Sequence, residues 1–334
     1  MHQILFRLPD FLPLIGGAPI YGYGVMLVVG FFGAMELAKF LARHSTIDPE
    51  LFANAALIAL VAGVAGARLS HVLENLGDYT RSDLSFGRNL WNAINLRNGG
   101  LTYYGGFLLA FPAVLAYGWY KRMPIRLGMD IVAPCLMIGL GLGRVGCYLN
   151  GCCYGAETNV SWGVAFPYHS DAYLEQARSG EIRIPPDLLK DGQPRTIEDI
   201  KSDLMLSADR RAELLEEASA QHALPVHPAE LYSTLTALLI AAFLVAYFTM
   251  PHAPGRVFAL MLIIESVSRF LLEEIRAEPV FAPFGKHLFG TMSFSMTLSI
   301  PLVLLGVVLW FVFGSRKVWV ERGQVQAKGN PAPV

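Results

Sequence analysis

Residues 127–148 read LGMDIVAPCLMIGLGLGRVGCY, an apolar run in which Asp130 and Arg144 are the charged residues. A run of about 20 apolar residues can cross a hydrocarbon core of ~30 Å as an α-helix. The composition of the whole chain agrees, because 54% of its 334 residues are hydrophobic and 16% are charged. Soluble domains carry about 25% charged residues. The sequence therefore predicts an integral membrane protein.

Six further apolar blocks of comparable length predict an all-α fold with about seven transmembrane helices and a small periplasmic insertion. The expected spans cover residues 20–41, 51–72, 101–120, 127–148, 229–250, 257–272 and 289–313. The segment before the first block lacks a basic start and is interrupted by prolines. We therefore expect no cleavable signal peptide, and the first span should itself direct insertion.

The connections divide the chain into four parts. Residues 1–155 are expected to hold the first four spans together with an interfacial helix at 83–98, where Trp91 and Leu90 alternate with arginines. Residues 156–226 are rich in charge and proline and predict a soluble insertion. Residues 227–315 hold the last three spans, and residues 316–334 form a polar tail expected to be disordered. In the insertion, Thr196 and Asp199 have capping-box spacing and Ser207 is an expected N-cap.

Basic residues in the short connections predict the orientation, because positively charged loops remain in the cytoplasm. The side richer in them carries Lys39, Arg43, Lys121, Arg122, Arg126, Arg256, Arg316, Lys317, Arg322 and Lys328. The opposite side carries Arg7, Arg81, Arg88, Arg97, Arg276 and Lys286. We therefore expect a multi-pass protein of the bacterial inner membrane, with its amino terminus outside and its carboxyl terminus in the cytoplasm.

This topology brings the unusual polar residues of the spans to one level, near the outer ends of the helices. Arg68, Arg144 and Arg269 share this level. An arginine within a span costs about 2.5 to 3.5 kcal/mol on insertion scales and therefore suggests a functional site. Converging guanidinium groups suit a phospholipid phosphate. The alternative for each arginine is a structural role, in which it reaches the membrane interface or pairs with an acid such as Glu273 or Glu265.

Five motifs occur in an order and spacing that resembles the prolipoprotein diacylglyceryl transferase family. They are GGLTYYGGF at 99–107, GRVGCYLNGCCYG at 143–155, HPAELYS at 227–233, SRFLLEE at 268–274 and MSFSMTLSIPL at 292–302. The resemblance covers essentially every expected span. It implies transfer of the diacylglyceryl group of phosphatidylglycerol to the lipobox cysteine thiol of a prolipoprotein, forming a thioether and releasing glycerol phosphate.

The resemblance also implies functional residues, which match the family pattern at Tyr23, Arg144, Asn150, Gly155, His227, Arg269 and Glu273. Tyr104 stands where a histidine is common in the family. Cys147 replaces an asparagine, Cys152 a glutamate, Glu230 a glutamine and Glu265 a tyrosine. These departures leave the identity of the general base open, whereas the expected class of substrate is less affected.

The implied chemistry requires an activated thiol and a stabilised phosphate leaving group. A cysteine with a pKa of ~8.5 is only a few per cent thiolate at neutral pH. We expect Arg144 and Arg269 to bind the phosphate. Tyr104 would position groups or relay a proton. Glu273, His227 or Glu230 would orient groups or accept the proton.

The expected partners are phosphatidylglycerol, prolipoprotein signal peptides with a lipobox cysteine, and membrane lipid, with no nucleic acid. The expected donor-lipid contacts are Arg144, Arg269, Arg68, Tyr23, Asn150 and Gly155. We expect no cofactor and no metal, because the cysteines lack a second pair that would complete a zinc pattern. Cys147 could form a disulfide with Cys152 or Cys153. The alternative function is a divergent relative that binds or moves phospholipid without transfer.

Overall fold

The computed structural model describes residues 4–7, 17, 19–80, 85–95, 100, 102–203, 205–276, 293–314, 318–321 and 324–327. The side chains of Phe86, Tyr103, Tyr104, Phe294, 318–321 and 324–327 lie outside this description. The chain divides into two compact units. The first comprises Met1–Ala34, Ala133–Tyr247 and Phe258–Val312, and the second Met35–Val132, Phe248–Val257 and Phe313–Val334.

In the described part of the chain, each of the seven blocks that the sequence predicts holds an apolar helix. These helices are α1 (Gly22–Arg43), α2 (Pro49–Glu74), α5 (Tyr103–Tyr120), α6 (Ile125–Asn150), α10 (Ala229–Phe248), α11 (Arg256–Glu273) and α12 (Phe294–Gly314). Within the described residues, five of them (α1, α2, α6, α10 and α12) are long and apolar enough to cross a membrane. The helices α5 and α11 are shorter, with 18 residues each. The prediction of an all-α, multi-pass membrane protein is confirmed.

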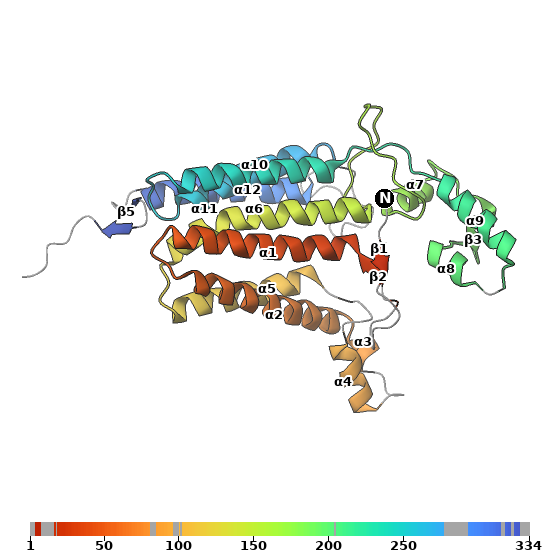
Figure 1. The fold of residues 1–334 in the computed structure, drawn as a ribbon, viewed down its shortest axis with the longest axis horizontal. Helices are drawn as coiled ribbons and strands as arrows, with labels where there is room; N and C mark the ends of the chain where they lie inside the picture. The colour runs from red at the N-terminus through yellow and green to blue at the C-terminus, as the bar shows by residue number, and fades with distance from the viewer. Residues whose placement is uncertain are drawn as a thin grey trace, which may run out of the picture. The chain divides into compact units, whose positions relative to one another are not determined.

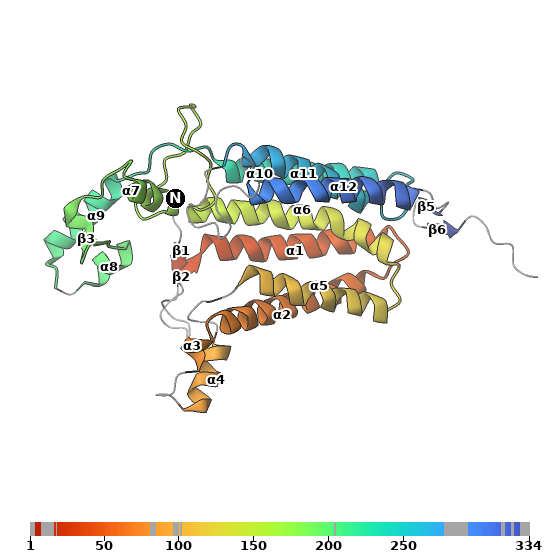
Figure 2. The ribbon, with the colours of Figure 1, turned by 180° about the vertical axis from the view of Figure 1, so that it is seen from behind.

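The helices of the first unit pack through small residues. In α6, Gly141 lies against α10, where its carbonyl accepts a hydrogen bond of 3.1 Å from Thr234 Oγ1. Gly146 lies against α1, and a Cβ there would come within 3.0 Å of Tyr23 Cδ2. Close approach at glycine is a common way to associate helices in lipid, where apolar burial gives little driving force. Figures 1 and 2 show α6, α10, α11 and α12 running side by side.

The soluble insertion predicted at 156–226 belongs to the first unit. It contains α7 (Asp171–Ser179), η1 (Pro186–Leu188), β3 (Leu189–Lys190), β4 (Gln193–Pro194), α8 (Ile197–Ser202) and α9 (Ala208–Ala220). Its apolar core includes Phe166, Tyr173 and Leu214, all nearly inaccessible to solvent. The capping box of Thr196 and Asp199 is present at α8, and Ser207 caps α9. Both capping predictions are confirmed.

The second unit contains the tight helix pair α2 and α5. Gly66 and Gly105 allow this contact, because a Cβ on Gly66 would collide with the Gly105 carbonyl oxygen. The unit also contains α3 (Leu76–Tyr79) and α4 (Phe86–Ile94). Helix α4 lies within the predicted interfacial segment 83–98 and exposes 66% of Trp91. Such an aromatic face suits the membrane interface, although the depth of α4 in a membrane remains a prediction.

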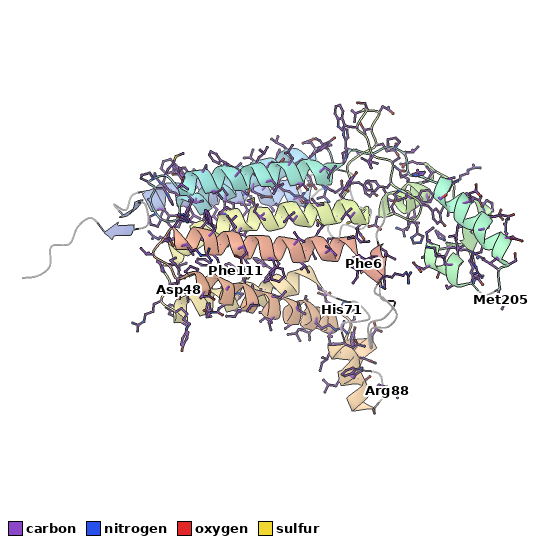
Figure 3. All side chains as sticks on the ribbon, viewed as in Figure 1. Phe6, Asp48, His71, Arg88, Phe111 and Met205 are labelled. Carbon is purple, nitrogen blue, oxygen red and sulfur yellow. The ribbon has the colours of Figure 1, made fainter. Side chains whose placement is uncertain are left out.

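Apolar side chains cover the outside of the spans. Phe111 of α5 is 54% exposed, and it is marked in Figure 3. Leu108 on the same helix and Val61 on α2 are about 70% exposed. Water would penalise such surfaces, whereas lipid solvates them. The exposed apolar faces therefore agree with a membrane environment.

Short strands form the remaining elements. Strands β1 (Ile4–Arg7) and β2 (Pro19–Tyr21) pair antiparallel before α1, with Phe6 opposite Ile20. Strands β5 (Val318–Glu321) and β6 (Gln324–Ala327) pair antiparallel within the tail that the sequence predicts to be disordered. The other tail residues, 316–317, 322–323 and 328–334, lie outside the described residues. Disorder of the tail stays a prediction.

Candidate active site at the end of helix α6

The end of α6 holds the first group of candidate residues. Arg144 is half-buried one turn before Cys147. The helix ends at Asn150, and Gly151 follows in the left-handed conformation with φ 77°. The N–H groups of Gly151 and Cys152 both donate to the Cys147 carbonyl, at 2.9 and 3.1 Å. Glycine favours such a helix end because it lacks a Cβ. The chain therefore folds back over the last turn of α6.

Tyr23 of α1 lies against this last turn, as its contact with Gly146 requires. Electrostatic interactions link Tyr23 to Arg144 and to the sulfur atoms of Cys147, Cys152 and Cys153. Its ring is 40% exposed. Tyr23 therefore lies beside both Arg144 and the cysteines, as expected for a residue of the same site.

A second group lies on α11 and at the start of α12. Arg269 Nη2 lies 3.0 Å from Glu273 Oε2 and donates to Ser295 Oγ at 3.1 Å. The opposite carboxylate oxygen, Glu273 Oε1, accepts from Ser293 Oγ at 3.2 Å. Arg276 Nη1 lies 3.5 Å from Glu273 Oε2. One carboxylate thus orients two guanidinium groups, which share its negative charge.

Backbone pairing brings the end of the GRVGCYLNGCCYG motif to the end of α11. Gly155 N–H donates to the His227 carbonyl at 2.8 Å, and Ala156 N–H donates to the Ile275 carbonyl at 2.8 Å. A Cβ on Gly155 would lie 2.7 Å from both His227 Cβ and the Ile275 oxygen. Glycine is therefore required for this three-way crossing. This contact explains why Gly155 belongs to the motif.

His227 and Glu230 lie at the start of α10. His227 Nδ1 is 3.3 Å from the Tyr232 hydroxyl, which also accepts from Trp162 Nε1 at 2.7 Å. Glu230 is 1% exposed. Among the described residues, neither of its carboxylate oxygens has a hydrogen-bond partner. A buried carboxylate without a partner is costly and suggests a role with a ligand or a transferred proton.

Electrostatic interactions connect these groups. The charges of Arg144 and Arg276 act on Cys153, Glu230 and Arg269. Hydrogen bonds from the Cys147 and Cys152 thiols, together with the two arginines, lower the pKa of Cys153 below its usual range and outweigh its burial. The first unit therefore contains a cationic centre with acids and thiols around it.

Arg68 of the second unit makes different contacts from those expected of a phosphate ligand. Its Nε donates to the Ala93 carbonyl at 2.8 Å, and Nη2 donates to the Asn92 carbonyl at 2.7 Å. Nη1 donates to the Gly100 carbonyl at 3.0 Å. These bonds attach α4 and the Gly100 segment to α2 and favour the structural alternative. The Tyr104 side chain lies outside the described residues, so its role stays a prediction.

The structure adds residues that the sequence does not single out as site members. Ser293 and Ser295 bind Glu273 and Arg269, and Arg276 shares the Glu273 carboxylate. The two serines belong to the MSFSMTLSIPL motif, which is the signal that could reveal them. Arg276 follows Glu273 by three residues, a spacing that supports contact at a helix end.

Comparison with known proteins identifies the family. A sequence model described as prolipoprotein diacylglyceryl transferase matches residues 9–312. Curated relatives named phosphatidylglycerol–prolipoprotein diacylglyceryl transferase include one from Corynebacterium diphtheriae, 29% identical, covering 81% of this chain and 82% of its own length. The relative from Chromobacterium violaceum is 29% identical, and the match covers 92% of this chain and 98% of the relative. The relative from Clostridium tetani is 24% identical, and the match covers 95% of this chain and 100% of the relative.

The fold and these matches define a multi-pass membrane transferase. The chain belongs to the prolipoprotein diacylglyceryl transferase family. The resemblance inferred from the five motifs is therefore confirmed. The individual site residues remain predictions, which the geometry described above makes testable.

Proposed function

We propose that this transferase moves the diacylglyceryl group of phosphatidylglycerol to the lipobox cysteine of a prolipoprotein, the first step of bacterial lipoprotein maturation. The acceptor sulfur forms a bond to the glycerol carbon while the bond from that carbon to the phosphate oxygen breaks. The acceptor thiol loses one proton, and glycerol phosphate leaves with the electron pair of the broken bond. The product is a thioether.

The cluster of three arginines is the observation that carries this proposal. Arg144 and Arg276 both act electrostatically on Arg269, so three like charges share one site. Glu273 neutralises part of this charge through Arg269 and Arg276. A bound phosphate diester would supply further negative charge and accept the planar donors of the guanidinium groups. Positioned cations also stabilise the charge that develops on a leaving phosphate.

An apolar groove supports a diacyl lipid as the donor. The groove lies between α11 and α12, has a volume of about 220 Å³ and is lined by residues that include Ser266, Phe270, Ser299 and Val303. Phe270 directly follows Arg269 along α11. An acyl chain in this groove would allow the attached headgroup to reach Arg269, which lies on α11 beside the groove-lining Phe270. Apolar burial of the chain would add to the binding energy.

Glu230 is the best-placed candidate for accepting the thiol proton. Its buried carboxylate has no hydrogen-bond partner among the described residues, and the charge of Cys153 acts on it. Glu273, in contrast, is held by two arginines and a serine. We therefore assign proton transfer to Glu230 and orientation of the arginines to Glu273. His227 would position the outer edge of the site through Tyr232.

An assay with purified protein tests the proposed reaction. The protein would be incubated with phosphatidylglycerol vesicles and a lipobox peptide, and the peptide mass would be measured. We expect a diacylglyceryl adduct that survives alkaline treatment of ester bonds as a glyceryl thioether. A peptide with serine in place of the cysteine is the matched control. Binding of phosphatidylglycerol without any adduct would instead support a relative that binds or moves lipid.

We further propose an inner-membrane location with the insertion outside, on the basis of the charged connections. Met205 in the insertion is 97% exposed and is marked in Figure 3. A Met205→Cys variant in intact spheroplasts should gain labelling by a membrane-impermeant thiol reagent relative to the parent chain. Labelling that appears only after lysis would reverse the orientation.

A further inference from the structure

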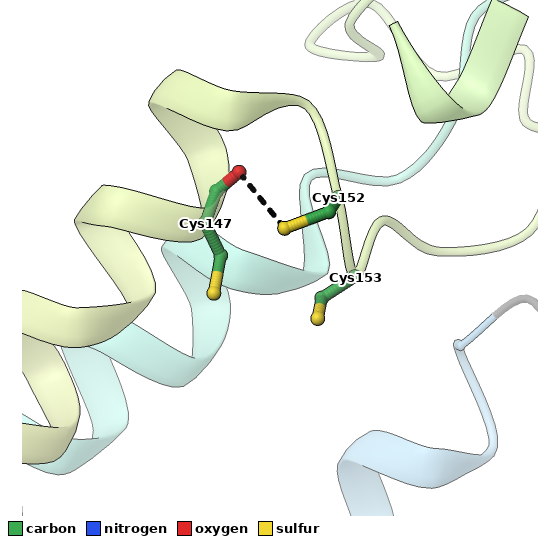
Figure 4. Close-up of side chains that lie close together, drawn as sticks. All are labelled: Cys147, Cys152 and Cys153. Carbon is green, nitrogen blue, oxygen red and sulfur yellow. Dashed lines mark hydrogen bonds between the residues drawn. The ribbon is translucent and has the colours of Figure 1, made fainter. Parts of the chain in front are cut away.

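Three cysteine thiols gather where α6 ends. The sulfur atoms of Cys147, Cys152 and Cys153 all lie within 4.8 Å of one another. Figure 4 shows the three side chains around the last turn of α6 and the following loop. The structure records all of them as free thiols. The sequence predicts no metal here, because spacing alone does not reveal that the loop folds back.

The backbone holds this cluster in place. Gly151 has φ 77° and Cys153 has φ 67°, so the chain uses the left-handed region twice within three residues. A Cβ on Gly151 would meet Ser170 Cβ at 3.0 Å, so the loop is also packed from the insertion side. The Cys152 thiol donates to the Cys147 carbonyl at 3.7 Å. Left-handed conformation is costly for a residue other than glycine, and such residues are enriched at functional sites.

The sulfur separations suit a single thiophilic ion. A Zn–S bond is about 2.3 Å long, so two ligands of a tetrahedral site lie about 3.8 Å apart. The sulfur atoms lie within 4.8 Å of one another. Small side-chain rotations that move each sulfur by about 1 Å or less would bring them to the separation of a tetrahedral site. Thiolates select soft ions such as Zn²⁺ and Cu⁺. Zinc sites with three protein ligands leave a fourth position open, which is characteristic of catalytic centres.

We propose that Cys147, Cys152 and Cys153 form a three-thiolate site for a divalent ion of the Zn²⁺ class, whose open position binds the thiol of the acceptor substrate. The second half of this inference rests on the proposed function. Binding releases one proton from each of the three thiols to solvent, and the acceptor thiol gives up a fourth, to Glu230, as its sulfur becomes a ligand. No oxidant or reductant is consumed. The ion would keep the acceptor sulfur in the reactive thiolate form.

The surrounding charges support such a centre. A divalent ion with three thiolates carries one net negative charge, and a fourth thiolate would make it two. The positive charges of Arg144 and Arg276 act on the Cys153 sulfur. Two arginines thus balance the anionic centre. The same arginines belong to the proposed phosphate site, which would bring the donor lipid and the acceptor sulfur to one place.

Metal binding can be measured directly on the full-length protein in detergent. Reduced protein would be incubated with Zn²⁺ or Co²⁺ and desalted, and the retained metal would be quantified per chain. We expect one ion per chain, and for Co²⁺ the intense visible and thiolate charge-transfer bands of a tetrahedral thiolate site. Cys147→Ser, Cys152→Ser and Cys153→Ser should each weaken retention at least tenfold. Cys135→Ala is the matched control, because Cys135 is buried about 18 Å away along α6 and should not affect retention.

A second readout does not depend on variants that could misfold. In the wild-type protein, Zn²⁺ should protect three thiols from alkylation, and a chelator should restore their reactivity. Failure to retain an ion would overturn the metal site. A protein mass two hydrogens below that of the reduced chain, which indicates a disulfide, would also overturn it. Addition of a lipobox peptide should shift the Co²⁺ bands, whereas the serine peptide should not. Unchanged bands would overturn the open position.

The two proposals fail in different ways. Diacylglyceryl transfer by metal-free protein, or by the triple serine variant, at the parent rate would overturn the role of the ion in activating the acceptor thiol and leave the proposed function intact. Metal retention and the thiol-dependent shift without transfer to any peptide would overturn the proposed function and leave the site intact. Loss of both metal and transfer in the three variants, with both preserved in Cys135→Ala, would support the two together.

Discussion

Arg269 Nη2 lies 3.0 Å from Glu273 Oε2, one turn further along α11, and the same nitrogen donates to Ser295 Oγ at 3.1 Å. The carboxylate thus holds the guanidinium rather than serving as a free base. Arg269→Lys should lower transfer by about 10² or more, because an ammonium cannot reproduce the planar fork. Glu273→Gln should retain lipid binding and lose about tenfold in turnover through misorientation. Steady-state rates with phosphatidylglycerol would measure both. A larger loss for Glu273→Gln than for Arg269→Lys would assign proton transfer to Glu273.

Arg144 provides the second test of the arginine cluster. Arg144→Ala should abolish transfer while the protein still inserts and elutes as a folded species. Arg144→Lys should recover little of the activity, since its point charge cannot form paired hydrogen bonds with a phosphate. Arg178→Ala is a suitable control, because the Arg178 side chain is 65% exposed in the insertion. A structural role for Arg144 would instead appear as lost expression in both variants.

The third prediction asks whether the Tyr104 hydroxyl takes part in proton transfer from the acceptor thiol. Tyr104→Phe removes the hydroxyl and keeps the ring. If Tyr104 relays the thiol proton, turnover should fall by roughly 10² to 10⁴ with lipid binding nearly intact. Tyr104→His, which introduces the residue common in the family, should then retain measurable activity. Nearly unchanged lipidation in Tyr104→Phe would leave proton transfer to Glu230 and the thiol cluster.

Gly155 tests the crossing that joins the motif to α11. Gly155→Ala would bring a Cβ to 2.7 Å from His227 Cβ and the Ile275 oxygen. We expect a loss of about 1 to 3 kcal/mol of stability, the usual cost of overpacking, together with reduced activity. Gly139→Ala in α6 is the matched control, since its new Cβ would meet no atom within 4 Å. Thermal denaturation in detergent would compare the two, and equal midpoints would argue against the close crossing.

The stability of the insertion should depend on pH through the capping box of Thr196 and Asp199. Hydrogen bonds from the Thr196 side chain and backbone lower the pKa of Asp199. Because the folded pKa lies below the unfolded value of ~3.9, this stabilisation is fully present above about pH 4. It is lost as the pH falls through the folded pKa. Asp199→Asn cannot titrate, so hydrogen exchange across residues 197–202 should differ from the parent at neutral pH and converge in acid. A constant difference down to about pH 2 would exclude the carboxylate as the cause.

Several features can be predicted from the sequence because they depend on local patterns. Apolar length alone locates the spans, so each predicted block overlaps its helix, with ends that differ by a few residues. The cap at Thr196 follows from the spacing to Asp199, and the family follows from its motifs. These features require only neighbouring residues, since a helix and its cap form within a few turns.

Other features depend on contacts between distant segments. The Arg68 guanidinium donates hydrogen bonds to the carbonyls of Ala93, Asn92 and Gly100. No sequence pattern around Arg68 reveals these partners. The three sulfurs meet because Gly151 and Cys153 reverse the chain beyond α6. The isolation of Glu230 likewise depends on the packing around it. Hydrophobic periodicity carries no information on such contacts, and they must be read from the fold.

Lipidation of a reporter in cells is a direct test of diacylglyceryl transfer by this protein. A bacterium depleted of its own diacylglyceryl transferase would express this chain together with a reporter prolipoprotein, and the mass of the reporter would be measured. We expect a diacylglyceryl thioether on the lipobox cysteine with the parent chain, and an unmodified precursor with the equally abundant Arg144→Ala variant. An unmodified precursor with the inserted, folded parent chain would show that the protein does not catalyse this transfer.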